Sequence, residues 1–139
     1  MKTLLDANVC LRYLLYDIED QALAATKFIE DGAEVTLEVL AECVYVLDGV
    51  YGVGKAEISE TLRNFLDEVF CSRMAVAKCA FIYFAMLKLD FVDCILLAEW
   101  SVNDREIATF DKELKKKLLS LHFKRAVELD NEQAEEDNK

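Results

Sequence analysis

The sequence contains no proline and only four glycines among its 139 residues. Because these two residues most often end helices and form turns, we expect few breaks in regular structure. The longest apolar stretches, such as residues 80–87, are far shorter than the ~20 residues that span a bilayer. The N-terminal residues also lack a basic region that leads into a small-residue cleavage site. We therefore expect a helix-rich protein with no membrane segment and no secretory signal.

Positive charge is also scarce, since the net charge is −11 and the sequence pI is near 4.5. Domains that coat nucleic acid electrostatically are usually basic, so this class is disfavoured. An enzyme acting on nucleic acid remains open, because carboxylates around bound metal ions supply negative charge. Residues 128–139 carry six acids, one lysine and no aromatic residue. We expect them to be a disordered acidic tail behind a single domain at residues 1–127.

Histidine is almost absent, since His122 is the only one, so a histidine-based site has no second histidine ligand and a catalytic role for His122 is disfavoured. The five cysteines form no Cys-x-x-Cys pair and are scattered through apolar segments. We interpret them as buried, unpaired thiols of a protein in the reducing cytoplasm.

Hydrophobic periodicity predicts short strands that alternate with helices. The predicted helices are residues 8–15, 19–31, 39–50, 55–70, 77–89, 91–102 and 112–119. The predicted strands are residues 2–5, 34–37, 73–76, 104–109 and 121–127. Alternation of this kind is typical of the α/β class, with a parallel sheet covered by helices on both faces.

Four acids stand out against this pattern. Asp6 and Asp111 each follow a predicted strand, where ligands of parallel sheets bind. Glu42 and Asp93 lie in apolar helical sequence, where an acid is unfavourable unless it is paired or binds a metal. In isolation, Asp6 and Asp111 could equally be the N-caps of the helices that follow them.

Taken together, the four acids favour a shared site over four separate structural roles. Oxygen ligands without histidine or cysteine suit Mg²⁺ or Mn²⁺ rather than zinc. Ions held by carboxylates suit phosphodiester hydrolysis, because they activate a water molecule and screen the phosphate charge. Asp90 and Glu38, by contrast, are interpreted as a helix cap and a surface or dipole-stabilising acid.

Four stretches resemble the PIN-domain nucleases, in the order and at the separations usual for that family. They are LLDANVCLRYLL, VLAECVYVLDGVYGVGKAEI, LDFVDCILLAEW and IATFDKEL, and the resemblance covers about residues 2–127. Within the family, the chain is similar to the short VapC-type toxins of prokaryotic toxin–antitoxin pairs. The resemblance implies a PIN-like three-layer sandwich with a central parallel sheet of four or five strands.

The resemblance also implies a function, a Mg²⁺- or Mn²⁺-dependent endoribonuclease acting on transfer or ribosomal RNA. It assigns Asp6, Glu42, Asp93 and Asp111 to the metal site, supported by Asn8, Thr109 and Arg12. Arg12 could orient an acid, contact phosphate or simply lie on the surface. The implied partners are a cognate VapB-type antitoxin and a second copy of the chain. The alternatives are a catalytically silent PIN-fold binding module, a stand-alone RNA-processing nuclease and a phospho-acceptor receiver domain.

Overall fold

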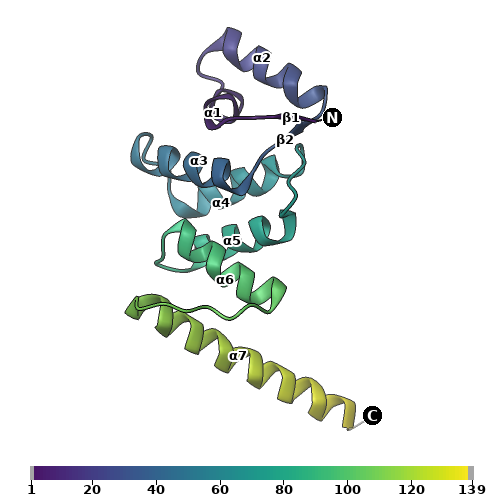
Figure 1. Ribbon diagram of the computed structural model, residues 1–139, viewed down its shortest axis with the longest axis vertical. Helices are drawn as coiled ribbons and strands as arrows, with labels where there is room; N and C mark the ends of the chain where they lie inside the picture. The colour runs from purple at the N-terminus through teal and green to yellow at the C-terminus, as the bar shows by residue number, and fades with distance from the viewer. Residues whose placement is uncertain (1, 138–139) are drawn as a thin grey trace. The chain divides into compact units, whose positions relative to one another are not determined.

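The computed structural model describes residues 2–137, and the side chains of residues 123–124, 126–134 and 137 are outside that description. The chain divides into two compact units, Met1–Arg105 and Glu106–Lys139 (Figure 1). The first unit contains, in chain order, β1 (Thr3–Leu4), α1 (Ala7–Leu15), α2 (Glu19–Glu30), β2 (Ala33–Glu34), α3 (Leu37–Gly49), α4 (Lys55–Phe65), α5 (Met74–Met86) and α6 (Phe91–Asn103). The second unit contains α7 (Lys112–Asp137), and the predicted domain boundary at residue 127 falls inside this helix and stays a prediction.

The predicted sheet of four or five strands is wrong, because the described residues form only a two-stranded parallel sheet. β1 pairs with β2 in the register Thr3 to Ala33 and Leu4 to Glu34. The other side of β2 makes a single parallel bridge to Phe70, where the Val35 N–H donates to the Phe70 carbonyl at 2.9 Å. The chain is therefore mostly helical, and the expected three-layer sandwich with a large central sheet is corrected.

Three of the predicted strands fail for local reasons. Residues 74–76 form the first turn of α5 instead of a strand. Residues 121–127 continue α7, because neither proline nor glycine interrupts the helix after Leu119. Residues 104–110 have no assigned helix or strand, and Asp104 ends α6 in the left-handed conformation with φ of 55°.

The seven predicted helices are present, but two of them differ clearly in length: α4 ends at Phe65 instead of residue 70, and α7 continues to Asp137 instead of ending at residue 119. α1 packs against α2 and α3, α5 packs against α4 and α6, and α3 also contacts α4 and α6. α3 therefore links the N-terminal helices to the helix that carries Asp93.

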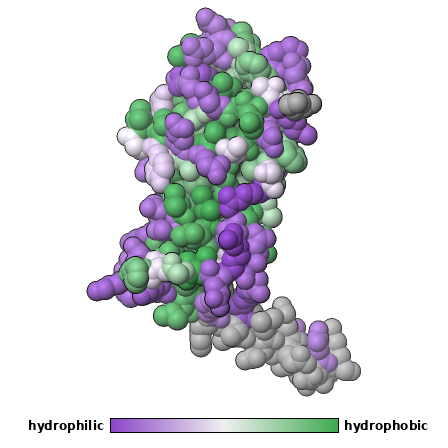
Figure 2. All heavy atoms as spheres, in the orientation of Figure 1, coloured by the Kyte–Doolittle hydropathy of each residue, from purple (hydrophilic) through white to green (hydrophobic). Residues whose placement is uncertain are grey.

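The core of the first unit is built from large apolar side chains of several helices, including Leu40, Phe65, Phe81 and Phe91. The unit also leaves apolar surface over α5 and α6, as Figure 2 shows, where Ile82 is 46% exposed and Met86 is 72% exposed. Among the described residues, the helices are too short or too polar to cross a bilayer.

Candidate functional site

Asp6 lies between β1 and α1 and is the N-cap of α1. Its Oδ1 atom accepts a hydrogen bond from the Val9 N–H at 2.9 Å, and its backbone is extended. The cap interpretation is therefore confirmed. A cap bond of this kind occupies one carboxylate oxygen, and the side chain is exposed, so capping does not exclude metal binding.

Glu42 lies on α3 and is exposed, which differs from its interpretation as an acid within an apolar face. Glu42 is exposed because residues that are adjacent in sequence point to different faces of a helix. Its neighbours one turn away are Glu38 and Tyr45, both exposed, whereas the buried Cys43 and Val44 belong to another face of the helix. No buried charge on α3 therefore requires a partner.

The buried thiol of Cys43 lies at the contact between α3 and α1. Its Sγ atom is 3.9 Å from the Ala7 carbonyl of α1. The pKa of the Cys43 thiol is raised far above its ordinary value, first because it hydrogen-bonds to the Cys10 thiol and then because it is buried. The negative charges of Glu42 and Asp6 raise it further. Because Asp6 precedes Ala7 and Glu42 precedes Cys43, this contact joins the two chain segments that carry the acids.

Asp93 is in the first turn of α6 and is partly exposed. Its backbone N–H donates to Oδ1 of Asp90 at 2.9 Å, so the prediction that Asp90 is the N-cap of this helix is confirmed. A second buried thiol, Cys94, lies among these groups. Burial is the main cause that raises its pKa to about 12; Asp90 and Asp93 raise it further, and Lys55 lowers it.

Asp111 and Thr109 belong to the second unit and are described within it. Asp111 Oδ1 accepts a hydrogen bond from the Leu114 N–H at 2.9 Å near the start of α7. Thr109 Oγ1 accepts one from the Asp111 N–H at 3.0 Å. The helix-cap interpretation of Asp111 is therefore confirmed, while its assignment to a metal site stays a prediction.

Arg12 binds none of the four candidate acids. Its Nη1 atom donates to both Asp17 carboxylate oxygens at 2.8 Å, and Nη2 donates to the Tyr51 hydroxyl at 3.3 Å. The side chain is only 12% exposed and connects the end of α1 to the turn between α3 and α4. With Asn8, Arg12 also lines a small cavity of about 150 Å³ between α1 and α2. Arg12 is therefore fixed mainly by structural contacts.

The candidate acids supply carboxylate oxygens, which are the type of ligand that a magnesium ion prefers. Among the side chains that the structure describes, no three acidic, histidine or cysteine residues are placed so that they could hold a metal ion together. Mg²⁺, however, usually binds through one or two carboxylates and completes its shell with water and substrate phosphates. The exposed pair Asp6 and Glu42 meets this requirement for donors, and Asp93 lies on a helix that packs against the helix of Glu42.

The acid that is buried in an apolar helix is Glu99, which the sequence analysis missed. It accepts hydrogen bonds from Arg73, from Asn103 Nδ2 at 3.0 Å and from Arg105 Nη1 at 3.4 Å. Glu99 is only 7% exposed to solvent. The signal was present in the sequence, because ILLAEW places Glu99 in an apolar run. Glu99 joins the start of α5 to the end of α6 and has a structural role.

All five cysteines are free thiols, as predicted, and four of them are buried: Cys10, Cys43, Cys71 and Cys94. Cys79 is half-buried. We expect the native chain to show one slow-reacting thiol towards Ellman's reagent at pH 8, and five after unfolding in urea, because burial excludes the reagent. A Cys79→Ser variant should lose the native reaction. Rapid labelling of two or more native thiols would contradict the described burial.

In comparisons with known proteins, no protein-family model, no curated protein and no solved structure matches the chain. The resemblance to the PIN-domain nucleases therefore stays a prediction.

Proposed function

We propose that the chain is a metal-dependent endoribonuclease that hydrolyses RNA phosphodiester bonds, with Asp6, Glu42 and Asp93 as its metal-site carboxylates. The proposal is supported above all by a contact between two segments: the Cys43 Sγ atom lies 3.9 Å from the Ala7 carbonyl, Cys43 follows Glu42 in the chain, and Ala7 follows Asp6. These acids come from segments far apart in the chain; both are exposed, and α1, which Asp6 caps, packs against α3, which carries Glu42. α3 in turn contacts α6, the helix that begins with Asp93 in its first turn.

In this proposal, the chain supplies oxygen donors and a fixed orientation. Asp6 is held by its cap bond to Val9, and Asp93 is held by the capped first turn of α6. Within the second unit, Asp111 is oriented by the Leu114 N–H and lies beside the Thr109 hydroxyl, and its supporting role stays a prediction of the resemblance. When bound, Mg²⁺ or Mn²⁺ would lower the pKa of a water molecule and screen the charge of the phosphodiester.

The direct test is RNA cleavage by the purified chain as a function of Mg²⁺ concentration, followed on labelled single-stranded RNA. We expect cleavage that EDTA abolishes, and a loss of at least about a hundredfold in kcat/KM in Glu42→Gln. Glu38→Gln is the matched control, because it removes an equally exposed acid one turn earlier on α3. Metal-independent cleavage, or equal cleavage by the Glu42→Gln variant, would contradict the proposal.

The same resemblance supports two partners as part of this proposal, a VapB-type antitoxin and a second copy of the chain. A small upstream open reading frame encoding a protein with a DNA-binding N-terminus would support the toxin–antitoxin role. Without such a reading frame, the stand-alone RNA-processing nuclease becomes the favoured form of the same activity.

A further inference from the structure

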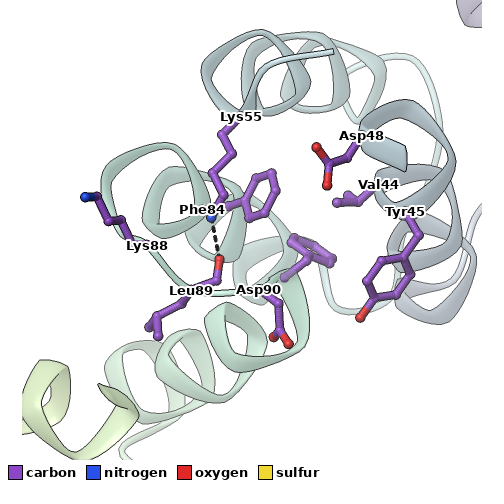
Figure 3. A pocket seen from close by; sticks show the side chains of 9 residues that line it. Val44, Tyr45, Asp48, Lys55, Phe84, Lys88, Leu89 and Asp90 are labelled. Carbon is purple, nitrogen blue, oxygen red and sulfur yellow. Dashed lines mark hydrogen bonds between the residues drawn. The ribbon is translucent and has the colours of Figure 1, made fainter. Parts of the chain in front are cut away.

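A pocket of about 380 Å³ lies between α3, the start of α4 and the loop that joins α5 to α6 (Figure 3). Its volume is in the range of pockets that bind small organic groups. Phe84 and Phe91 form a rigid, buried part of the lining, with ring centroids 5.9 Å apart in an edge-to-face arrangement. Tyr45, which is 51% exposed, contributes an aromatic ring that solvent can reach.

The charged side chains around this pocket are not equivalent. Lys55 Nζ donates to the carbonyls of Leu89 at 2.6 Å and Leu87 at 3.2 Å, and it lies 4.5 Å from the centre of the Phe84 ring. Its charge is therefore used to hold the loop before α6. Figure 3 shows Lys88 pointing away from the other lining side chains. Neither lysine is thus placed to attract a phosphate into the pocket.

The carboxylate oxygens in the pocket lining, by contrast, can accept hydrogen bonds from a ligand. Asp48 lines the pocket, is exposed and forms no salt bridge within the described part of the chain. Asp90 uses Oδ1 to cap α6. Two carboxylates would repel a phosphate group, and they accept hydrogen bonds from amino groups. The pocket therefore favours an uncharged aromatic ligand that carries an amino group.

The pocket is also next to two of the proposed metal-site acids. Tyr45 lies one helical turn after Glu42 on α3, and Asp90 lies three residues before Asp93. Residues three apart on a helix are neighbours on one face. A group bound in the pocket would therefore lie next to a substrate bound at those carboxylates.

We propose that this pocket binds an unpaired RNA base that carries an amino group, stacked on Tyr45 and hydrogen-bonded to Asp48. The choice of RNA as the molecule that carries this base rests on the proposed function. Stacking on aromatic side chains is the common way in which proteins hold unpaired bases. Carboxylates recognise cytosine through its N4 amino group, which uracil lacks. The pocket would thus set base preference beside the bond that is cut.

The test is an NMR titration of the isotope-labelled full chain with cytidine and with uridine, which removes phosphate charge from the measurement. We expect cytidine to shift the signals of Tyr45, Asp48 and Phe84, and to bind about tenfold more tightly than uridine. Tyr45→Ala should weaken cytidine binding about tenfold. Asp48→Asn should remove most of the preference for cytidine over uridine. Tyr16→Ala is the matched control, because Tyr16 is also 51% exposed and lies outside the pocket.

The outcomes separate this proposal from the proposed function. Absence of cytidine shifts at these residues, or equal binding by Tyr45→Ala, overturns the base pocket even if the chain cleaves RNA. Cytidine binding with the expected variant effects supports the pocket even if the chain cleaves no RNA, in which case the nuclease proposal fails. The circular dichroism spectrum and melting temperature of each variant confirm that it is folded.

Discussion

Asp6→Asn is expected to lower Mg²⁺-dependent RNA cleavage at least about a hundredfold while leaving the stability of the chain nearly unchanged. The two effects separate because Asp6 has two roles. Asparagine is as good an N-cap as aspartate, so it preserves the bond to the Val9 N–H. It lacks the negative charge that makes aspartate a strong ligand of a divalent cation. kcat/KM on labelled RNA and the free energy of unfolding in urea measure the two roles.

Two further variants complete this experiment. Asp6→Ala should lose cleavage and also about 1 kcal/mol of stability, because the cap is removed. Thr36→Ala is the matched control, since Thr36 Oγ1 caps α3 by accepting a bond from the Val39 N–H at 3.2 Å. It should lose similar stability and keep cleavage at a temperature where it is folded. If Asp6→Asn cleaves RNA at the unmodified rate, Asp6 is a cap alone.

Glu99→Ala is expected to lower the free energy of unfolding by about 2 kcal/mol. The substitution removes a largely buried acceptor that Arg73, Arg105 and Asn103 share, and it leaves their donors without this partner. The expected loss is below that of a fully buried pair, because the Arg73 and Arg105 side chains are 43% and 67% exposed. Urea unfolding followed by circular dichroism measures it. Glu60→Ala, at an exposed site on α4, should change stability by less than about 0.5 kcal/mol.

The contribution of Glu99 should also depend on pH in a defined direction. Its pKa is lowered from the ordinary value of 4.5, first by the hydrogen bond from Asn103 and then by that from Arg73, although burial opposes this shift. A carboxyl group whose pKa is lower in the folded state stabilises the protein above the unfolded pKa. The stability difference between the unmodified chain and Glu99→Gln should therefore be complete above pH 4.5 and shrink as the pH falls further. A difference that grows in acid would contradict the assigned contacts.

Helices could be predicted from the sequence because their signal is local. Periodic apolar residues and the caps Asp6, Asp90 and Asp111 lie within a few residues of the helices that they define. Strands were predicted poorly, since a strand of two to four residues is defined by the segment that pairs with it. The single bridge between Glu34 and Phe70 depends on a distant partner that local periodicity does not identify.

The candidate site was predictable only in part, for a related reason. Apolar neighbours in sequence suggested that Glu42 is buried, yet the helix turns it away from Cys43 and Val44. The same criterion, applied with helical phase, would have selected Glu99. The pocket beside Tyr45 could not be predicted either, because its lining comes from segments brought together only by folding.

The pairing of β2 with two distant segments has a consequence for the order in which the first unit folds. α4, α5 and α6 contact their neighbours in the chain, so this half has low contact order and can assemble early and fast. β2, by contrast, forms only by pairing with two segments that are distant in the chain, β1 and Phe70. Loop closure between such distant segments opposes their pairing until other contacts form. The pairing of β1 with β2, and with it the final position of Asp6 after β1, should therefore form after the helical half that carries Asp93.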